Sequence, residues 1–197
     1  MSRLFDLNAI GQKAKAGTSE INAGFHLAKF LRRHDEKIES IKNLIGRPPV
    51  EGEIYFLWTM KSFNAFTFIP YIFKESGIID ELVISTYSIN IRIIDALVKY
   101  VDQKRILSVV IFISDTIRTH NVKVYDHLMA LSEKYPIEIK YCWNHSKVTL
   151  MLSAGNYYGV EGSGNFGENA QHEQYIFYNS KEEYEFRKNA ILHAIKS

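Results

Sequence analysis

Hydrophobic residues follow a helical period in the first quarter of the chain. Apolar side chains recur three, four or seven positions apart from Leu27 to Ile45, with polar residues between them. This spacing predicts an amphipathic helix over Ser19–Ile45, which Gly46 and the prolines at 48 and 49 end. Residues 1–18 are polar and show no period, so we expect a loosely attached arm before this helix.

After the two prolines, short apolar strands alternate with helices. The predicted strands are Glu53–Met60, Glu81–Thr86, Leu107–Ser114, Ile137–Cys142, Lys147–Leu152, Tyr157–Glu161 and Glu173–Tyr178. The predicted helices are Phe63–Glu75, Ile91–Val101, Val124–Tyr135 and Glu182–Ile195. Strands separated by helices are typical of an α/β fold, so we expect a mixed β-sheet flanked by helices on both faces. We place an N-terminal arm and helix in residues 1–49 and the sheet domain in residues 50–197.

The composition is that of an ordinary globular domain. With 197 residues, of which 46% are hydrophobic and 23% charged, the chain is long enough to bury one substantial core. Its apolar runs are too short to span a bilayer and no secretory signal precedes them, so we expect a cytoplasmic protein without a membrane partner. The single cysteine, Cys142, fits a reducing compartment and is interpreted as a structural thiol. One cysteine near one histidine is a weak basis for a zinc site, so no metal or cofactor is expected.

Charge is distributed unevenly, although the net charge is only +2. Residues 1–48 hold nine basic and five acidic residues, which leaves the remainder slightly acidic. A basic N-terminal segment would help to hold a polyanion near a site elsewhere in the chain. A solvated helix face explains the same residues, and we favour that interpretation.

The segment from His145 to Glu173 gathers groups that can attack a phosphodiester without a metal. His145 supplies an imidazole nucleophile, and Lys147 supplies a compact positive charge for a phosphate oxygen. In an extended strand these two side chains share a face. Ser163 and Asn165, within Gly-Ser-Gly-Asn, supply hydrogen-bond donors for the negative charge of the transition state. Glu173 is suited to accept a hydrogen bond from the imidazole and to stabilise its charged form.

This set of groups leaves one chemical requirement open. The leaving oxygen needs a proton, and the chain holds no second copy of the motif to supply an acid. A symmetric dimer would supply it, with His145 of one subunit facing His145 of the partner subunit across a two-fold axis. We therefore expect a homodimer.

The same residues resemble the motif of the phospholipase D superfamily, which reads His-x-Lys, then an Asp after four intervening residues, and later Gly-Ser-x-Asn. The resemblance covers roughly the last three-quarters of the chain. It implies a phospholipase D-like fold and a metal-independent nuclease built as a homodimer. It also implies that His145 is the nucleophile, that Lys147, Ser163 and Asn165 bind phosphate, and that Glu173 is the active-site carboxylate. Leu152 stands where the motif has its Asp, which in the family is mainly a structural support.

The sequence therefore predicts a metal-independent phosphodiesterase, and among these a nuclease, that acts through a covalent phosphohistidine. Nucleic acid is the expected partner, with DNA ranked ahead of RNA. The first alternative is a phospholipase D-like protein that binds nucleic acid or acts as an adaptor without catalysis, which Leu152 and the N-terminal helix favour. A lipid-active phosphodiesterase ranks third, because the sequence shows no amphipathic membrane helix with an aromatic and aliphatic face.

Overall fold

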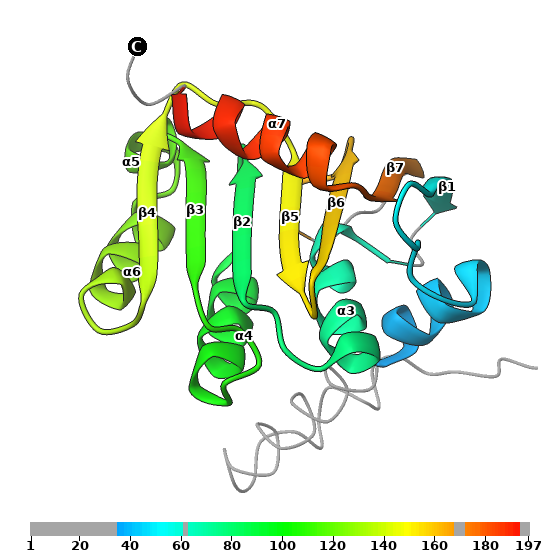
Figure 1. Ribbon diagram of the computed structural model, residues 1–197. Coiled ribbons are helices and arrows are strands. Elements are labelled where there is room, and N and C mark those ends of the chain that lie inside the picture. The colour runs from blue at the N-terminus through cyan, green and yellow to red at the C-terminus, as the bar shows by residue number, and fades with distance from the viewer. Residues whose placement is uncertain (1–34, 61–62, 168–171, 194–197) are drawn as a thin grey trace, which may run out of the picture. The chain divides into compact units, whose positions relative to one another are not determined.

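A mixed β-sheet of seven strands runs through the residues that the computed structural model describes, 35–60, 63–167 and 172–193 (Figure 1). The strands, in chain order, are β1 (Ile54–Met60), β2 (Glu81–Thr86), β3 (Val109–Ser114), β4 (Ile137–Cys142), β5 (Val148–Ser153), β6 (Asn156–Gly162) and β7 (His172–Asn179). Their order in the sheet is β1-β7-β6-β5-β2-β3-β4. The β2–β3 and β3–β4 pairs are parallel and the other pairs are antiparallel. The predicted mixed sheet is confirmed.

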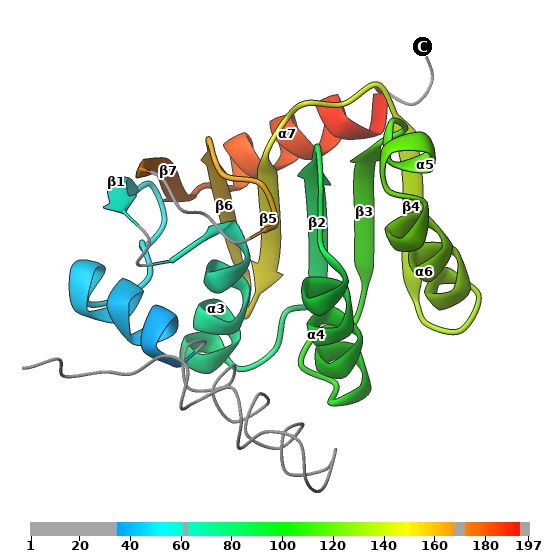
Figure 2. The same ribbon diagram turned by 180° about the vertical axis from the view of Figure 1, so that it is seen from behind.

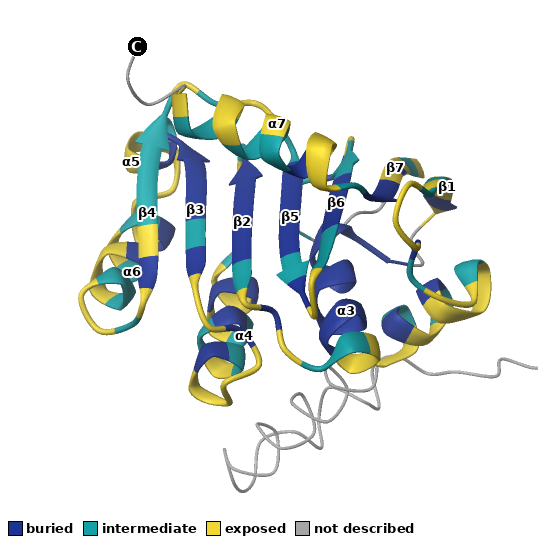
Figure 3. Cartoon of the chain, in the orientation of Figure 1, coloured by how far each residue is buried: buried dark blue, intermediate teal, exposed yellow. Residues whose placement is uncertain are grey.

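Helices cover both faces of this sheet, as the sequence predicted. The described residues after the first strand form the helices η1 (Ala65–Thr67), α3 (Phe68–Ser76), α4 (Ile91–Asp102), α5 (Ile117–His120), α6 (Val122–Ser132) and α7 (Lys181–His193). Helix α7 crosses one face, and the view from behind shows α3, α4 and α6 on the other (Figure 2). The larger core lies on the α3/α4 face and the smaller one lies beneath Tyr184 of α7, so the central strands are buried on both sides (Figure 3). Within the described residues, no helix has the length and apolar character needed to cross a membrane.

Asparagine side chains fix where several helices begin. Asn64, Asn90 and Asn121 each accept a hydrogen bond from the backbone N–H three residues further on, which satisfies a donor that the first turn leaves free. The Asn64 cap divides the predicted helix Phe63–Glu75 into η1 and α3. Pro70 lies in the first turn of α3, where its missing N–H costs no helical hydrogen bond.

A tight hairpin sets the register of β5 and β6. Ala154 and Gly155 both have positive φ angles, 49° and 75°, as the two central residues of a type I′ turn require. The resulting register places Lys147 beside Gly162, whose N–H donates to the Lys147 carbonyl at 3.3 Å. A Cβ atom on Gly162 would lie 2.3 Å from the Gln174 carbonyl oxygen, so close packing of β6 on β7 requires glycine here.

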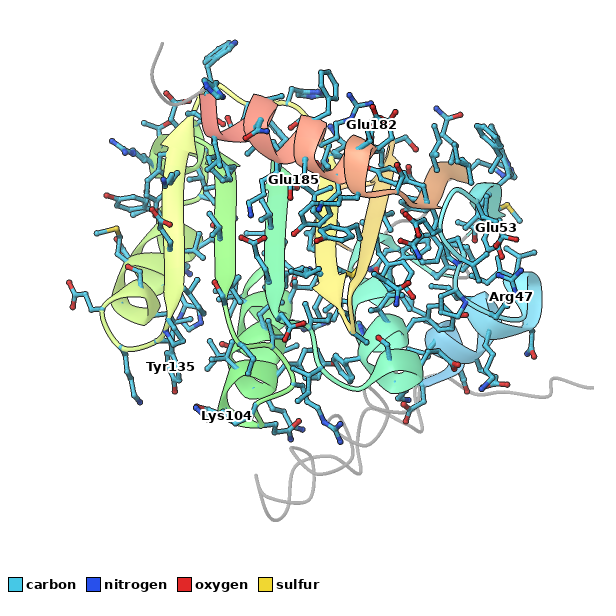
Figure 4. The ribbon with its side chains drawn as sticks, in the orientation of Figure 1. Arg47, Glu53, Lys104, Tyr135, Glu182 and Glu185 are labelled. Carbon is cyan, nitrogen blue, oxygen red and sulfur yellow. The ribbon has the colours of Figure 1, made fainter. Side chains whose placement is uncertain are left out.

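The described part of the N-terminal helix covers residues 35–45; the predicted arm and the first half of that helix lie outside the described residues. Ile38 and Ile41 are buried in the larger core. After this helix, Arg47 binds both carboxylate oxygens of Glu53, with N–O distances of 2.6 and 2.9 Å (Figure 4). The hydrogen bonds from Arg47 lower the pKa of Glu53 to about 2. The division of the chain at residue 49 stays a prediction.

Candidate active site

The site residues predicted from the sequence gather at one end of the sheet, which we call the site end. It is the end at which β2, β3, β4 and β6 finish and β5 and β7 begin, and it is the upper end in Figure 1. The register pairs Val148 with Glu161 and Gly162 with Tyr175. The segment before β5, the segment after β6 and the start of β7 are therefore brought together, although they lie up to 30 residues apart in sequence.

The loop 143–147, between β4 and β5, is fixed by Asn144. The Asn144 Oδ1 atom accepts hydrogen bonds from the backbone N–H and the hydroxyl of Ser146, at 2.9 and 2.7 Å. Its Nδ2 atom donates to Ser85 Oγ at the end of β2 at 3.0 Å. The Ser85 and Ser146 hydroxyls lie 2.5 Å apart. This network ties the loop to the centre of the sheet and determines where the next residue, His145, stands.

His145 and Lys147 contact each other directly. Lys147 Nζ lies 3.3 Å from His145 Nδ1 and donates to the His145 carbonyl oxygen at 2.9 Å. The sequence predicted an extended strand here, but β5 begins only at Val148, so the two side chains meet in the loop that Asn144 ties to the sheet. The Tyr87 ring, just after β2, packs against the exposed imidazole with a centroid distance of 5.0 Å.

Ser163 and Glu173 form the other half of the site. The Ser163 hydroxyl donates to the Glu173 carboxylate and accepts from the Gln174 N–H at 3.2 Å. Burial lowers the pKa of Lys147 below the ordinary lysine value, and the negative charge of Glu173 opposes that shift. Electrostatic interaction therefore connects Glu173 to the Lys147–His145 pair.

Asn165 lies two residues after Ser163 in the loop that follows β6. The loop is anchored by Phe166, which is buried and whose carbonyl accepts from the Asn90 N–H at the start of α4 at 3.2 Å. The Asn165 Oδ1 atom is buried and has no hydrogen-bond partner among the described residues. Because a side-chain amide can be turned to exchange its oxygen and nitrogen, this group can present a donor instead.

The structure thus brings four of the five predicted residues together as two bonded pairs, His145–Lys147 and Ser163–Glu173, which the charge interaction between Lys147 and Glu173 links. Within the described residues, no hydrogen bond joins the Asn165 side chain to these four. The described part of the chain also holds no cluster of three or more His, Cys, Asp or Glu side chains arranged to hold a metal ion. The two pairs supply an imidazole, a cation, a hydroxyl and a carboxylate at the site end.

Three residues at the site end were missed by the sequence interpretation. Asn144 and Tyr87 shape and cover the His145 loop, and Thr59 lies opposite Glu173 on the neighbouring strand β1. Asn144 adjoins the motif and could have been noticed as a typical turn residue. Thr59 carried a weaker signal, since it is a polar residue at an inward-facing position of an alternating apolar strand.

Leu152, at the position of the motif's Asp, lies at the opposite end of β5. It faces α7 and packs against the smaller core around Tyr184. Its cross-strand neighbour on β2 is Glu81. The Glu81 carboxylate accepts hydrogen bonds from Tyr184 Oη at 2.8 Å and from Lys188 Nζ at 2.7 Å. The Glu81 carboxylate therefore lies beside Leu152, on the face of the sheet that α7 covers, and its hydrogen bonds hold α7 there.

Comparison with known proteins rests on structure. No family model matches the sequence, and no curated protein matches it. The fold is similar to that of Nuc, a phospholipase D family member from Salmonella typhimurium, with a TM-score of 0.52 and 16% sequence identity over 72% of this chain and 93% of that one.

Two further solved structures align with lower TM-scores. Polyphosphate kinase from Porphyromonas gingivalis aligns with a TM-score of 0.49 and 16% identity over 64% of this chain, which spans only 23% of that chain. TrmBL2, an archaeal chromatin protein with a novel mode of DNA binding, aligns with a TM-score of 0.46 and 12% identity over 88% of this chain and 63% of that one. The likeness to Nuc agrees with the expectation from the motif: this chain has a phospholipase D-like fold.

Proposed function

We propose that this protein is a metal-independent phosphodiesterase of the phospholipase D superfamily, and specifically a nuclease that works through a phosphohistidine in a homodimer. The observation that carries the proposal is the contact of Lys147 Nζ with His145 Nδ1 at 3.3 Å, beside the Ser163–Glu173 hydrogen bond. In this proposal His145 is the nucleophile, Lys147 the phosphate-binding cation and Glu173 the carboxylate, and the two contacts at the same end of the sheet support these roles.

Phosphate binding would first rearrange the hydrogen bonds of His145. In the structure the Lys147 amine donates to Nδ1, so a neutral imidazole carries its proton on Nε2. When Lys147 turns to a phosphate oxygen, Nδ1 is released. His145 is exposed, so exchange with water can move the proton from Nε2 to Nδ1, where the Glu173 carboxylate can accept it in a hydrogen bond. Nε2 then has a free electron pair to attack phosphorus.

The chemistry then follows in two steps. In the first, the electron pair of His145 Nε2 forms the P–N bond, the P–O bond to the leaving group breaks, and the leaving oxygen takes a proton from His145 of the partner subunit. In the second, the partner subunit's His145, now neutral, takes a proton from water as the water oxygen attacks phosphorus. The P–N bond breaks and returns its electron pair to Nε2, so the net reaction is hydrolysis.

The rival hypothesis, a binding protein without catalysis, drew on the loss of the motif's Asp. Leu152 lies on the α7 face at the far end of β5, and its partner across the sheet is Glu81, which is bonded to Tyr184 and Lys188. The replacement therefore removes no group from the set around His145. This observation supports the catalytic proposal over the rival.

The proposal is tested by cleavage of labelled single- and double-stranded DNA and RNA in excess EDTA. We expect the wild type to cleave nucleic acid, with DNA the better substrate, and His145→Ala to be inactive. His120→Ala is the matched control, because His120 is an exposed histidine on α5 outside the site. Salt-dependent DNA binding by a folded protein that cleaves none of the four polymers would favour the rival hypothesis.

The dimer has a separate test. If each active site needs His145 from both subunits, equal amounts of wild type and His145→Ala, allowed to exchange subunits, should retain about a quarter of the wild-type activity, since only wild-type pairs are competent. Retention of half the activity would mean that each subunit works alone.

A further inference from the structure

Thr59 is a buried polar residue whose hydroxyl is not used by the fold. Its side chain is only 5% exposed, and its Oγ1 atom has no hydrogen-bond partner among the described residues. A buried hydroxyl without a partner loses its bonds to water and gains none in return, so it lowers the stability of the folded state. Such a group calls for a partner that is absent from the resting arrangement.

The position of Thr59 indicates which group that partner is. In the antiparallel β1–β7 pair, Thr59 lies directly opposite Glu173, and residues directly opposite each other project from the same face of the sheet. Their neighbours Leu57 and Tyr175 both lie in the larger core, so Thr59 and Glu173 face the side of the sheet that carries α3 and α4. The Cβ atoms of such a pair are about 5 Å apart, which is within the reach of a hydroxyl and a carboxylate.

The proposed reaction creates a need for this hydroxyl. Ser163 has one hydroxyl proton, and in the structure that proton is donated to Glu173. Ser163 cannot donate the same proton to a phosphate oxygen, so binding phosphate means releasing the carboxylate. Glu173 would then lose a donor at the moment when it has to hold the imidazolium in place.

We propose that Thr59 is a positioning residue that takes over from Ser163: its hydroxyl donates to the Glu173 carboxylate when Ser163 turns to the phosphate. The inference rests on the proposed function and adds a residue and a conformational step to it. Thr59 acts through Glu173 and need not touch the substrate. Its unused hydroxyl in the free protein is the donor held ready for the exchange.

Thr59→Val and Thr59→Ser separate this role from a structural one. Valine keeps the shape and removes the hydroxyl, so kcat should fall about 10- to 100-fold, as for the loss of one hydrogen bond to a charged group, with KM changed less than about twofold. The thermal midpoint of Thr59→Val should equal or exceed that of the wild type, because no hydrogen bond of the resting fold is lost. Thr59→Ser keeps the hydroxyl and should restore most of kcat.

Tyr71→Phe is the matched control. It also removes a buried hydroxyl that has no partner among the described residues, but on α3, where its electrostatic neighbours include Glu75 and Tyr55 rather than the site residues. Its kcat should stay at the wild-type value. An active wild type with an unchanged kcat in Thr59→Val would overturn the role of Thr59 and leave the proposed function standing. An inactive wild type in EDTA would overturn both.

Discussion

Polar side chains lie at both ends of the sheet, but they are bonded in different ways at the two ends. At the far end, opposite the site end, Glu81 is held by Tyr184 and Lys188, and the buried Ser153 hydroxyl lies 2.6 Å from that of Ser76. These bonds join α7 and α3 to the sheet. None of these side chains is a proposed site residue, so we expect the bonds to contribute to the stability of the fold.

At the site end the bonds connect groups that, in the proposed mechanism, separate before they act. Lys147 is bonded to His145, and the Ser163 hydroxyl is bonded to Glu173, yet both donors are proposed phosphate ligands. The Thr59 hydroxyl has no hydrogen-bond partner among the described residues. The comparison teaches that polar groups at the two ends of one sheet have different roles: substitutions at the far end should cost stability, and substitutions at the site end should cost activity.

His145→Ala should give the largest effect and the clearest separation. Removing the nucleophile should lower kcat at least about 10⁴-fold, the range found when a covalent catalytic residue is deleted. The exposed imidazole supports no buried contact, so the urea midpoint should match that of the wild type. A loss of activity that tracks a loss of folded protein would break the comparison.

Asn144→Ala should give the next largest effect. The substitution removes the side chain that ties the His145 loop to Ser85 and Ser146, and a displacement of the nucleophile by about 1 Å can cost about 100-fold in rate. Activity is measured per folded molecule, with circular dichroism as the check. Asn144→Asp keeps the acceptor for Ser146 and loses the donor to Ser85, so its rate should lie between those of the alanine variant and the wild type. A wild-type rate in Asn144→Ala would show that the loop needs no such anchor.

Glu81→Gln tests the far end of the sheet. Loss of the carboxylate charge weakens the bonds to Tyr184 and Lys188, and the free energy of unfolding should fall by about 1–3 kcal/mol in urea denaturation. The kcat of the folded protein should not change. Glu182→Gln is the control, because Glu182 is an exposed carboxylate on α7, and its effect should stay within about 0.5 kcal/mol. A reduced kcat in folded Glu81→Gln would contradict the division between the two ends.

Glu173→Gln should give the smallest of these effects that we use as a test, a shift in the pH dependence of kcat/KM. In the proposed mechanism the charged form of Lys147 binds phosphate, so activity should fall at high pH as Lys147 loses its proton. The negative charge of Glu173 raises the pKa of Lys147 against the lowering by burial, so removing that charge lowers the pKa further. The alkaline limb of the pH profile of kcat/KM should move to lower pH, whatever the maximum value of kcat/KM in this variant. A limb that stays in place or moves to higher pH would assign it to another group.

Much of the fold could be predicted from local patterns, because strands and helices here follow their hydrophobic period. The strand Ile137–Cys142 and the helix after Asn90 were placed within a residue of their observed bounds. The short helix Ile117–His120 was missed, since four residues carry no helical period. The hydrophobic pattern also predicted α6 with ends at Val124 and Tyr135, whereas it begins at the Asn121 cap and ends at Ser132.

The sequence named the residues of the candidate site but did not give their arrangement, and their roles stay a prediction. His145 and Lys147 were expected to share a strand face, but they meet in a loop that side-chain hydrogen bonds of Asn144 hold to the sheet. The pairing of Thr59 with Glu173 joins residues that are far apart in sequence, and no local pattern specifies which strand lies beside β7. The register of strands that are distant in sequence and the hydrogen bonds within loops therefore could not be predicted from the sequence.

The most direct test of the account is to trap the covalent intermediate. The wild type is mixed with a ³²P-labelled oligonucleotide in EDTA, quenched during turnover under alkaline conditions that preserve a P–N bond, and digested to map the labelled peptide. We predict acid-labile label on the peptide that contains His145, and none with His145→Ala. Turnover by the wild type without any labelled peptide, or label that persists in His145→Ala, would contradict the central claim that His145 is the nucleophile.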